Sequence, residues 1–208
     1  MYDDNHEVLK GKVKQITEIA KKSYSGVDTV IVDFDVHGNI TQIITEGGSG
    51  DGLVKCEYTH DKNGKKTSVI QKYYEKWESY KNCRKQQTYK YDGNGHIAES
   101  IANTKMLKEN SDHEVKQDIA FFKYDNEGYL IAYDGYLDTE HRFSAKYKYN
   151  TRHLLIERDH FSEGGHAEGK RIYKYQVIDK KENWLKRTIS SSYDSTKADT
   201  FMRKITYY

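Results

Sequence analysis

One short motif recurs along the chain and constrains its fold more than any other feature. It reads aromatic-x-aromatic-Asp, two variable residues, Gly, one residue and an apolar residue. The clearest copies span residues 89–97 and 122–130, and further copies span 32–40, 58–65, 147–155 and 173–185. Their second aromatic positions are residues 34, 60, 91, 124, 149 and 175, so the motif returns every 25 to 33 residues. Such repetition predicts a fold assembled from one supersecondary unit.

Each part of the motif is typical of a β-hairpin. In Tyr89-Lys90-Tyr91 the two rings alternate with lysine, which places the rings on one face of a strand and the lysine on the other. The Asp at the start of the turn can accept a hydrogen bond from a backbone N–H two residues later. The Gly three residues after Asp can adopt the positive φ of a tight turn with a bulge. For the copy at 173–185 we expect a longer turn before Asn183-Trp184-Leu185.

The hairpins predict a meander of antiparallel strands. Residues 13–19 read as the opening strand and 201–208 as the final strand, and polar segments between hairpins mark the opposite rim. No segment shows a long, capped helical period, so we expect few helices. We predict an all-β single domain, 1–208, in which 1–10 is a flexible lead and 11–208 forms about 12–14 strands in up-and-down order.

A meander of this length has to protect its two edge strands. The chain has no proline, one of the residues that usually blocks strand edges. We therefore favour a soluble barrel or partly closed shell over the alternative, a flat single-layer sheet whose ends are guarded by Lys and Glu. Because the strand face opposite the tyrosines carries Lys90, Lys123, Lys148 and Lys174, a membrane-spanning barrel is not expected.

Composition and charge exclude several classes of protein. The chain contains 19 Tyr, 6 Phe and 2 Trp, so aromatic rings are expected to supply the apolar area that a low count of aliphatic residues leaves missing. With 34 basic and 32 acidic residues, the net charge is only +2 and no basic patch is visible, which argues against a nucleic-acid partner. No apolar run is long enough for a membrane helix. Residues 1–10 lack the apolar core of a signal peptide.

The two cysteines are expected to be free thiols. Cys56 and Cys83 share a strand face in this reading, but a strand near Ile70 should lie between theirs. Two strand spacings amount to roughly 9.6 Å, beyond the ~7 Å reach of a disulfide between Cα atoms.

The motif resembles the YD (RHS-type) repeat, whose core is Tyr-Asp-x-x-Gly-x-apolar, over most of the chain from about residue 11 to 208. The chain is still more similar to small YD-like proteins of Bacteroidetes, often exported lipoproteins of unknown function, some of them described as soluble, porin-like barrels. Segments 11–18 and 183–187 are similar to segments common in that group. The resemblance implies a location in the cell envelope or secretion, as a lipoprotein whose signal is absent from this chain. It implies no reaction.

Catalytic and metal-binding patterns are not apparent. Three of the nine histidines, His37, His96 and His153, fall at or beside the tight turns, and no HExxH, HxH or Cys/His cluster occurs. No nucleophile motif is present, and most Asp and Glu residues already have a local role in turns. We expect no enzyme activity, no cofactor and no metal site, with an unrecognised hydrolase as the weakest alternative.

The tyrosines of the repeated motif leave two functional interpretations open. The rings could fill the interior, or they could line a lumen or concave face that stacks a sugar or peptide. In the second case the candidate ligand-binding residues are Trp77, Trp184, Tyr91, Tyr124, Tyr149 and Tyr175. The predicted function is therefore a non-catalytic exported or envelope protein that binds a glycan or a protein partner. The alternative is a purely structural envelope component.

Overall fold

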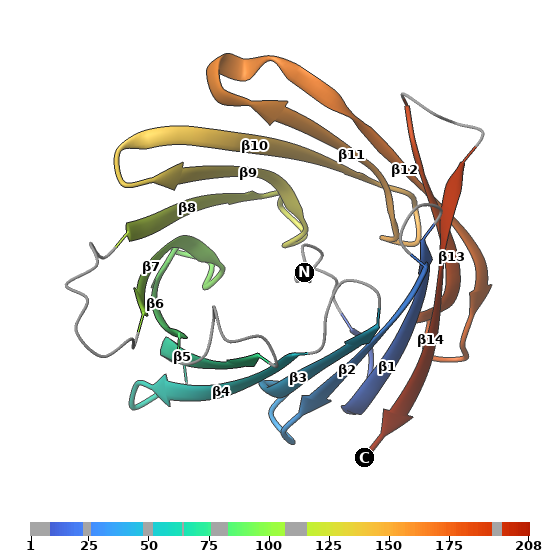
Figure 1. Cartoon of the computed structure of the whole chain (residues 1–208), viewed down its shortest axis with the longest axis horizontal. Coiled ribbons are helices and arrows are strands. Elements are labelled where there is room, and N and C mark those ends of the chain that lie inside the picture. The colour runs from blue at the N-terminus through green and yellow to red at the C-terminus, as the bar shows by residue number, and fades with distance from the viewer. Residues whose placement is uncertain are drawn as a thin grey trace.

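The computed structural model contains a closed barrel of fourteen antiparallel strands (Figure 1). The structure describes residues 9–22, 26–47, 52–63, 65–75, 83–106, 116–192 and 197–208. Each strand pairs with its neighbours in sequence, and β1 pairs with β14 to close the ring. The predicted all-β meander of 12–14 strands is confirmed, and the flat-sheet alternative is wrong because no described strand is left at an edge.

Most strands are eight to ten residues long and join in simple hairpins. The strands are β1 (Val13–Lys22), β2 (Gly26–Phe34), β3 (Ile40–Gly47), β4 (Gly52–His60), β5 (Lys66–Glu75), β6 (Cys83–Tyr91), β7 (Ile97–Met106), β8 (Lys116–Tyr124), β9 (Leu130–Leu137), β10 (Glu140–Tyr149), β11 (Leu155–Ser162), β12 (Ala167–Ile178), β13 (Trp184–Ser191) and β14 (Ala198–Tyr207). The helical content of the described residues is a single 3₁₀ turn, η2 (Glu163–Gly165), as the absence of helical periodicity predicts.

The motif turns gather at one rim, where a side-chain oxygen organises each of them. In the β6–β7 turn, Asp92 Oδ1 accepts hydrogen bonds from the backbone N–H of Asn94 and His96, both at 2.9 Å. The backbone N–H of Gly95 donates to the Asp92 carbonyl, and Gly95 has φ +91° as the motif predicts. The same side-chain bonds occur at Asp35, Asp61, Asp125, Asn150 and Asp179.

Two turns adopt this geometry without glycine. His153 and Glu182 take its place with φ +59° and +64°. The expected longer turn after Tyr175 is wrong: Asp179 starts a turn of the same size as the others. The additional residues lie in β12, which has two register irregularities between Tyr175 and Ile178. Bulges absorb extra residues without changing the turn.

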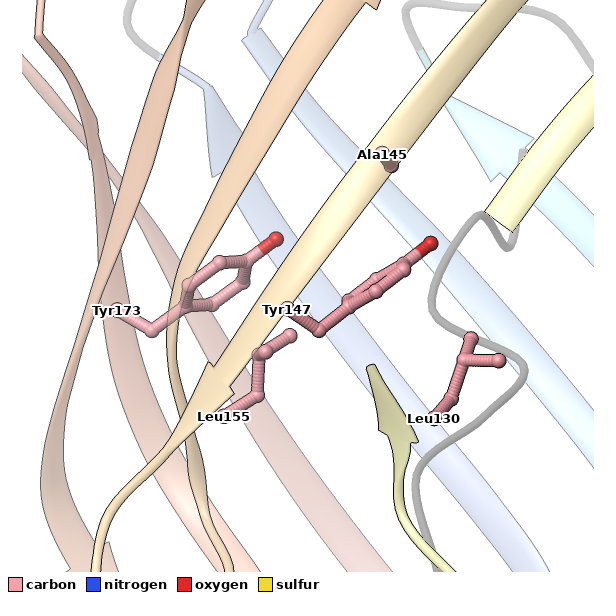
Figure 2. Packing of buried hydrophobic residues seen from close by; sticks show 5 residues of the cluster. All are labelled: Leu130, Ala145, Tyr147, Leu155 and Tyr173. Carbon is pink, nitrogen blue, oxygen red and sulfur yellow. The ribbon is translucent and has the colours of Figure 1, made fainter. Parts of the chain in front are cut away.

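The two faces of each strand differ in burial. In β1, Ile16, Glu18 and Ala20 are buried on one face. In a closed barrel this face points into the lumen, where side chains from neighbouring strands converge. The main apolar cluster lies on the wall formed by β9 to β12 (Figure 2). Its buried members are Leu130, Ala145, Tyr147, Leu155 and Tyr173.

The outer face carries paired charges. Lys90 bonds Glu99 at 2.7 Å, and Glu57 bonds Lys72 at 2.6 Å, each across adjacent strands. Glu157 accepts from Lys148 and from Lys170. Two of the lysines that alternate with the motif tyrosines, Lys90 and Lys148, are therefore paired with a glutamate of the neighbouring strand.

The cysteine prediction is confirmed where the structure describes it. Strand β5 lies between β4, which carries Cys56, and β6, which carries Cys83. Cys56 is a buried free thiol. The side chain of Cys83 lies outside the described residues.

Candidate ligand-binding site at the barrel mouth

Three of the predicted site tyrosines form a repeated lock between hairpins. The hydroxyl of Tyr175 donates to the Leu155 carbonyl at 2.8 Å, and that of Tyr149 to the Leu130 carbonyl at 3.0 Å. The hydroxyl of Tyr91 donates in the same way to the Lys66 carbonyl at 2.5 Å. In each case the acceptor is the first residue of the return strand of the preceding hairpin. In these three repeats, the second tyrosine of the motif thus hydrogen-bonds its own hairpin to the preceding hairpin.

Tyr124 contacts its preceding repeat through ring stacking instead. Its ring lies 4.9 Å from that of His96, with an interplanar angle of 26°. Burial raises the pKa of Tyr124 to about 12, so the hydroxyl stays protonated at neutral pH. A similar stack joins Tyr129 to His153, whose ring centroids lie 4.4 Å apart.

The two predicted tryptophans are not brought together with the tyrosines as a rim platform. Trp184 is only 3% exposed and lies between two guanidinium groups, those of Arg203 at 3.7 Å and Arg187 at 4.0 Å. These distances are typical of cation–π contacts. Trp77 lies outside the described residues. The described candidates are thus spread over β6, β8, β10, β12 and β13 rather than gathered at one point.

The tyrosine lock is also absent from the second hairpin. The residue of the second hairpin that corresponds to Tyr91 is His60, at the same bulge between motif strand and turn. His60 is exposed, and its ring centroid is 6.4 Å from that of Tyr58. The counterpart carbonyl for a lock here belongs to Ile40, the first residue of β3. Histidine lacks the phenolic hydroxyl that forms the lock in the hairpins of Tyr91, Tyr149 and Tyr175.

A cleft of about 430 Å³ opens at the rim of tight turns, and the second hairpin contributes Tyr58 and Lys66 to its lining. It lies among the start of β1, the β2–β3 turn and the adjoining ends of β4 and β5. Its lining residues are Leu9, Gly11, Lys12, Val13, Phe34, Asp35, Val36, His37, Gly38, Ile40, Tyr58 and Lys66. The volume falls within the range of small-molecule sites, which combine apolar rings with a few polar groups.

The carboxylate in the cleft, that of Asp35, already accepts hydrogen bonds from the β2–β3 turn. Asp35 accepts hydrogen bonds from the backbone N–H groups of His37 and Asn39 and from the Asn39 side-chain amide, at 2.8 to 2.9 Å. Burial by itself would raise the pKa of Asp35, but these bonds outweigh it and hold the pKa below its ordinary value. Asp35 therefore serves the turn as a carboxylate.

The cations of the cleft have a different environment. Lys66 is half-buried, with its Nζ 5.0 Å from the centroid of the Tyr58 ring. Burial lowers the pKa of Lys66, although the charge of Asp35 partly opposes this. Burial also raises the pKa of Tyr58, so its hydroxyl stays protonated while its ring lies beside the Lys66 ammonium group.

The described residues provide little for metal or nucleophilic chemistry. No group of three or more His, Cys, Asp or Glu residues among them could hold a metal ion. Burial raises the pKa of the Cys56 thiol, which disfavours the reactive thiolate. No helix in the described part of the chain is long and apolar enough to cross a membrane.

Sequence reasoning missed the cleft because it followed the best copies of the motif. Phe34 and Tyr58 belong to less regular copies, while Lys12 and Lys66 occupy positions without any motif. The histidine at position 60 is the one second aromatic position without Tyr or Phe, and it belongs to the hairpin that contributes Tyr58 and Lys66 to the cleft.

Comparison with known proteins supports the architecture. A porin-like protein from Bacteroides uniformis superimposes with a TM-score of 0.56 and 10% identity, covering 95% of this chain and 99% of that one. A porin-like protein from Bacteroides vulgatus superimposes with a TM-score of 0.57 and 13% sequence identity, covering 94% of this chain and 98% of that one. No family model matches, and no curated protein matches. The chain thus shares the fold of porin-like barrels, and its resemblance to YD repeats stays a prediction.

Proposed function

We propose that this chain is a non-catalytic exported or cell-envelope protein that binds a glycan in the cleft at the mouth of its barrel. The observation that carries the proposal is the cleft itself, in which Phe34 and Tyr58 lie beside Lys12 and Lys66. Sugars bind to sites of this composition because their C–H faces pack on aromatic rings while their hydroxyls bond polar groups. The location rests on the resemblance to exported proteins and on the porin-like fold.

The non-catalytic part of the proposal is supported by how the charged groups are used. The turn aspartates accept backbone hydrogen bonds, and the outer glutamates pair with lysines of adjacent strands. These roles account for carboxylates that would otherwise be candidates for acid–base catalysis.

We further propose that the barrel wall faces water rather than lipid. A membrane barrel presents an apolar band about 25 Å tall on its outside. Here the outward side chains of Lys90 and Lys148 are 68% and 61% exposed and belong to ion pairs. The chain should therefore refold and remain monodisperse without detergent. Dependence of folding on detergent would contradict a water-facing wall.

A glycan array followed by calorimetry tests the binding site. Val36 is 59% exposed at the cleft, so Val36→Trp should block the site without disturbing the barrel core. Asn126→Trp is the matched control, because Asn126 follows the turn aspartate of the β8–β9 hairpin as Val36 follows Asp35. We expect glycans captured by the parent protein to be lost with Val36→Trp and retained with Asn126→Trp.

The negative results are equally informative. Capture of no glycan, or equal capture by both variants, would overturn the mouth cleft as a glycan site. Failure to capture any glycan would favour the alternative of a structural envelope component. That alternative is supported by the inner wall around Trp184, which is closed by packed arginine and aromatic side chains.

A further inference from the structure

The lysines of the cleft differ from several lysines of the barrel wall in their partners. On the wall, Lys72 pairs with Glu57 at 2.6 Å, and Lys170 with Glu157 and Asp159 at 2.9 and 3.5 Å. Neither Lys12 nor Lys66 forms an ion pair with a carboxylate of the described residues. Two ammonium groups thus line one cleft without neutralisation by a neighbouring strand.

The remaining charges around the cleft do not cancel these two cations. Asp35 is the carboxylate among the described lining residues, and its oxygens accept three hydrogen bonds within the turn. His37, at the same turn, is exposed, and Tyr58 keeps its proton because its pKa is raised. At neutral pH the cleft is therefore electropositive.

The position of Lys66 strengthens its attraction for an anion. The side chain is half-buried and lies over the Tyr58 ring, so fewer water molecules screen its charge than on the outer wall. A ligand that packs a flat face on the rings of Tyr58 and Phe34 could present an anionic group to Lys12 and Lys66 at the same time. Uronic acids combine these two features in one residue.

We infer that the mouth cleft recognises an acidic glycan, with the sugar face on Phe34 and Tyr58 and a uronic-acid carboxylate directed to Lys12 and Lys66. This inference rests on the proposed glycan binding and adds the chemical class of the sugar. Charge-assisted hydrogen bonds contribute about 1.5–3 kcal/mol, which corresponds to roughly a 10- to 100-fold difference in affinity.

Calorimetry with a panel of galacturonate, glucuronate and mannuronate oligosaccharides tests the inference. Each oligosaccharide is compared with its methyl ester, which keeps the ring and removes the charge. We expect at least one acid to bind, with its ester roughly 10-fold weaker or more. Lys66→Met should abolish the preference for acid over ester, because methionine keeps the contact with Tyr58 but carries no charge. A similar, smaller loss is expected for Lys12→Met.

The matched control is Lys65→Met. Lys65 is adjacent in sequence and also lies over a tyrosine, with its Nζ 4.4 Å from the Tyr91 ring, but it does not line the cleft. Its substitution should leave acid binding within about two-fold of the parent protein. Equal losses in Lys65→Met and Lys66→Met would indicate general rim charge and overturn the inference.

The pH dependence provides a second readout. The other titratable residues that line the cleft with Lys66 are Lys12, Asp35, His37 and Tyr58, of which Tyr58 lies under its ammonium group and Asp35 acts on its charge. Because burial lowers the pKa of Lys66 below 10.5, acid binding should decline at a lower pH than an ordinary lysine would give. This decline should be absent from Lys66→Met.

The outcomes separate the two proposals. If the esters bind as tightly as the acids, the acidic-glycan inference is overturned and glycan binding at the cleft stands. The same conclusion follows if no acidic oligosaccharide binds while a neutral glycan from the array binds the parent protein and no longer binds the Val36→Trp variant. If no saccharide binds in either experiment, both proposals fail together.

Discussion

At the scale of single residues, the tight turns depend on a side-chain acceptor more than on a charge. Asp92 and Asn150 each accept the N–H groups two and four residues ahead, at closely similar distances. Asn150 performs this role with an amide oxygen. The carboxylates at the other turns therefore add a titratable group to a geometry that does not need one.

This difference predicts how acid should affect stability. Backbone hydrogen bonds, chiefly from His96, lower the pKa of Asp92 below 3.8. Since the folded pKa lies below the unfolded one, the stabilisation is present above pH 3.8 and is lost as the pH falls through the folded pKa. Asp92→Asn should keep the turn and remove this acid sensitivity. Urea unfolding between about pH 6 and pH 3 should show a smaller loss of unfolding free energy for the variant. An identical loss would contradict the assignment.

At the scale of elements, the tyrosine lock explains how consecutive hairpins keep their register. Each locking hydroxyl bonds a carbonyl at the beginning of the previous return strand. Half-buried carbonyls need a partner, because leaving one unsatisfied costs free energy. The motif thus encodes contacts between hairpins as well as the turn within one hairpin.

Removal of single hydroxyls should measure the lock. Tyr175→Phe and Tyr149→Phe each delete a hydroxyl that bonds the neighbouring strand, at an expected cost of about 1–2 kcal/mol in unfolding free energy. Tyr124→Phe is the matched control, since the contact of Tyr124 with the preceding hairpin is its ring stack with His96. Urea denaturation of the three variants should show the control close to the parent protein. Equal losses in all three would show that the hydroxyls do not form locks.

The sequence could predict the hairpins because their determinants are local. Asp92 and Gly95, for example, specify a turn through atoms within four residues of each other. It could not predict which turn would follow Tyr175, because bulges in β12 decide where Asp179 falls. The cleft was harder still, since it combines residues of separate elements: the start of β1, the β2–β3 turn and the adjoining ends of β4 and β5.

Restoration of the missing lock should act on stability and binding in opposite directions. His60→Tyr places a hydroxyl where it can reach the Ile40 carbonyl, by analogy with Tyr91 and Lys66. We expect a gain of about 1 kcal/mol in unfolding free energy. Glycan binding should weaken, because a ring that reaches Ile40 would lie beside a lining residue of the cleft. His60→Phe is the control that fills space without the hydrogen bond. It should weaken binding without the same gain in stability, and binding unaffected by either variant would place the ligand elsewhere.

At the scale of the whole molecule, the barrel has a packed seam and an open mouth. The seam joins the first and last strands, where Arg203 Nε donates to Glu18 Oε2 at 2.7 Å across 185 residues of sequence. Arg203 also lies over Trp184, which extends the packing to β13. The mouth cleft lies among the start of β1, the β2–β3 turn and the adjoining ends of β4 and β5. The proposed glycan would therefore bind between the first strand and the first two hairpins.

The buried pair at the seam should govern closure of the ring. Arg203→Met keeps an apolar contact with Trp184 but leaves the Glu18 carboxylate buried without its arginine, at an expected cost of about 3–5 kcal/mol. Glu18→Leu combined with Arg203→Met should recover much of this loss, because no lone charge then remains in the wall. Hydrogen exchange should be faster in β1 and β14 of the single variant than in β6 and β7. If the two substitutions are additive and exchange increases evenly around the barrel, the pair does not hold the seam closed.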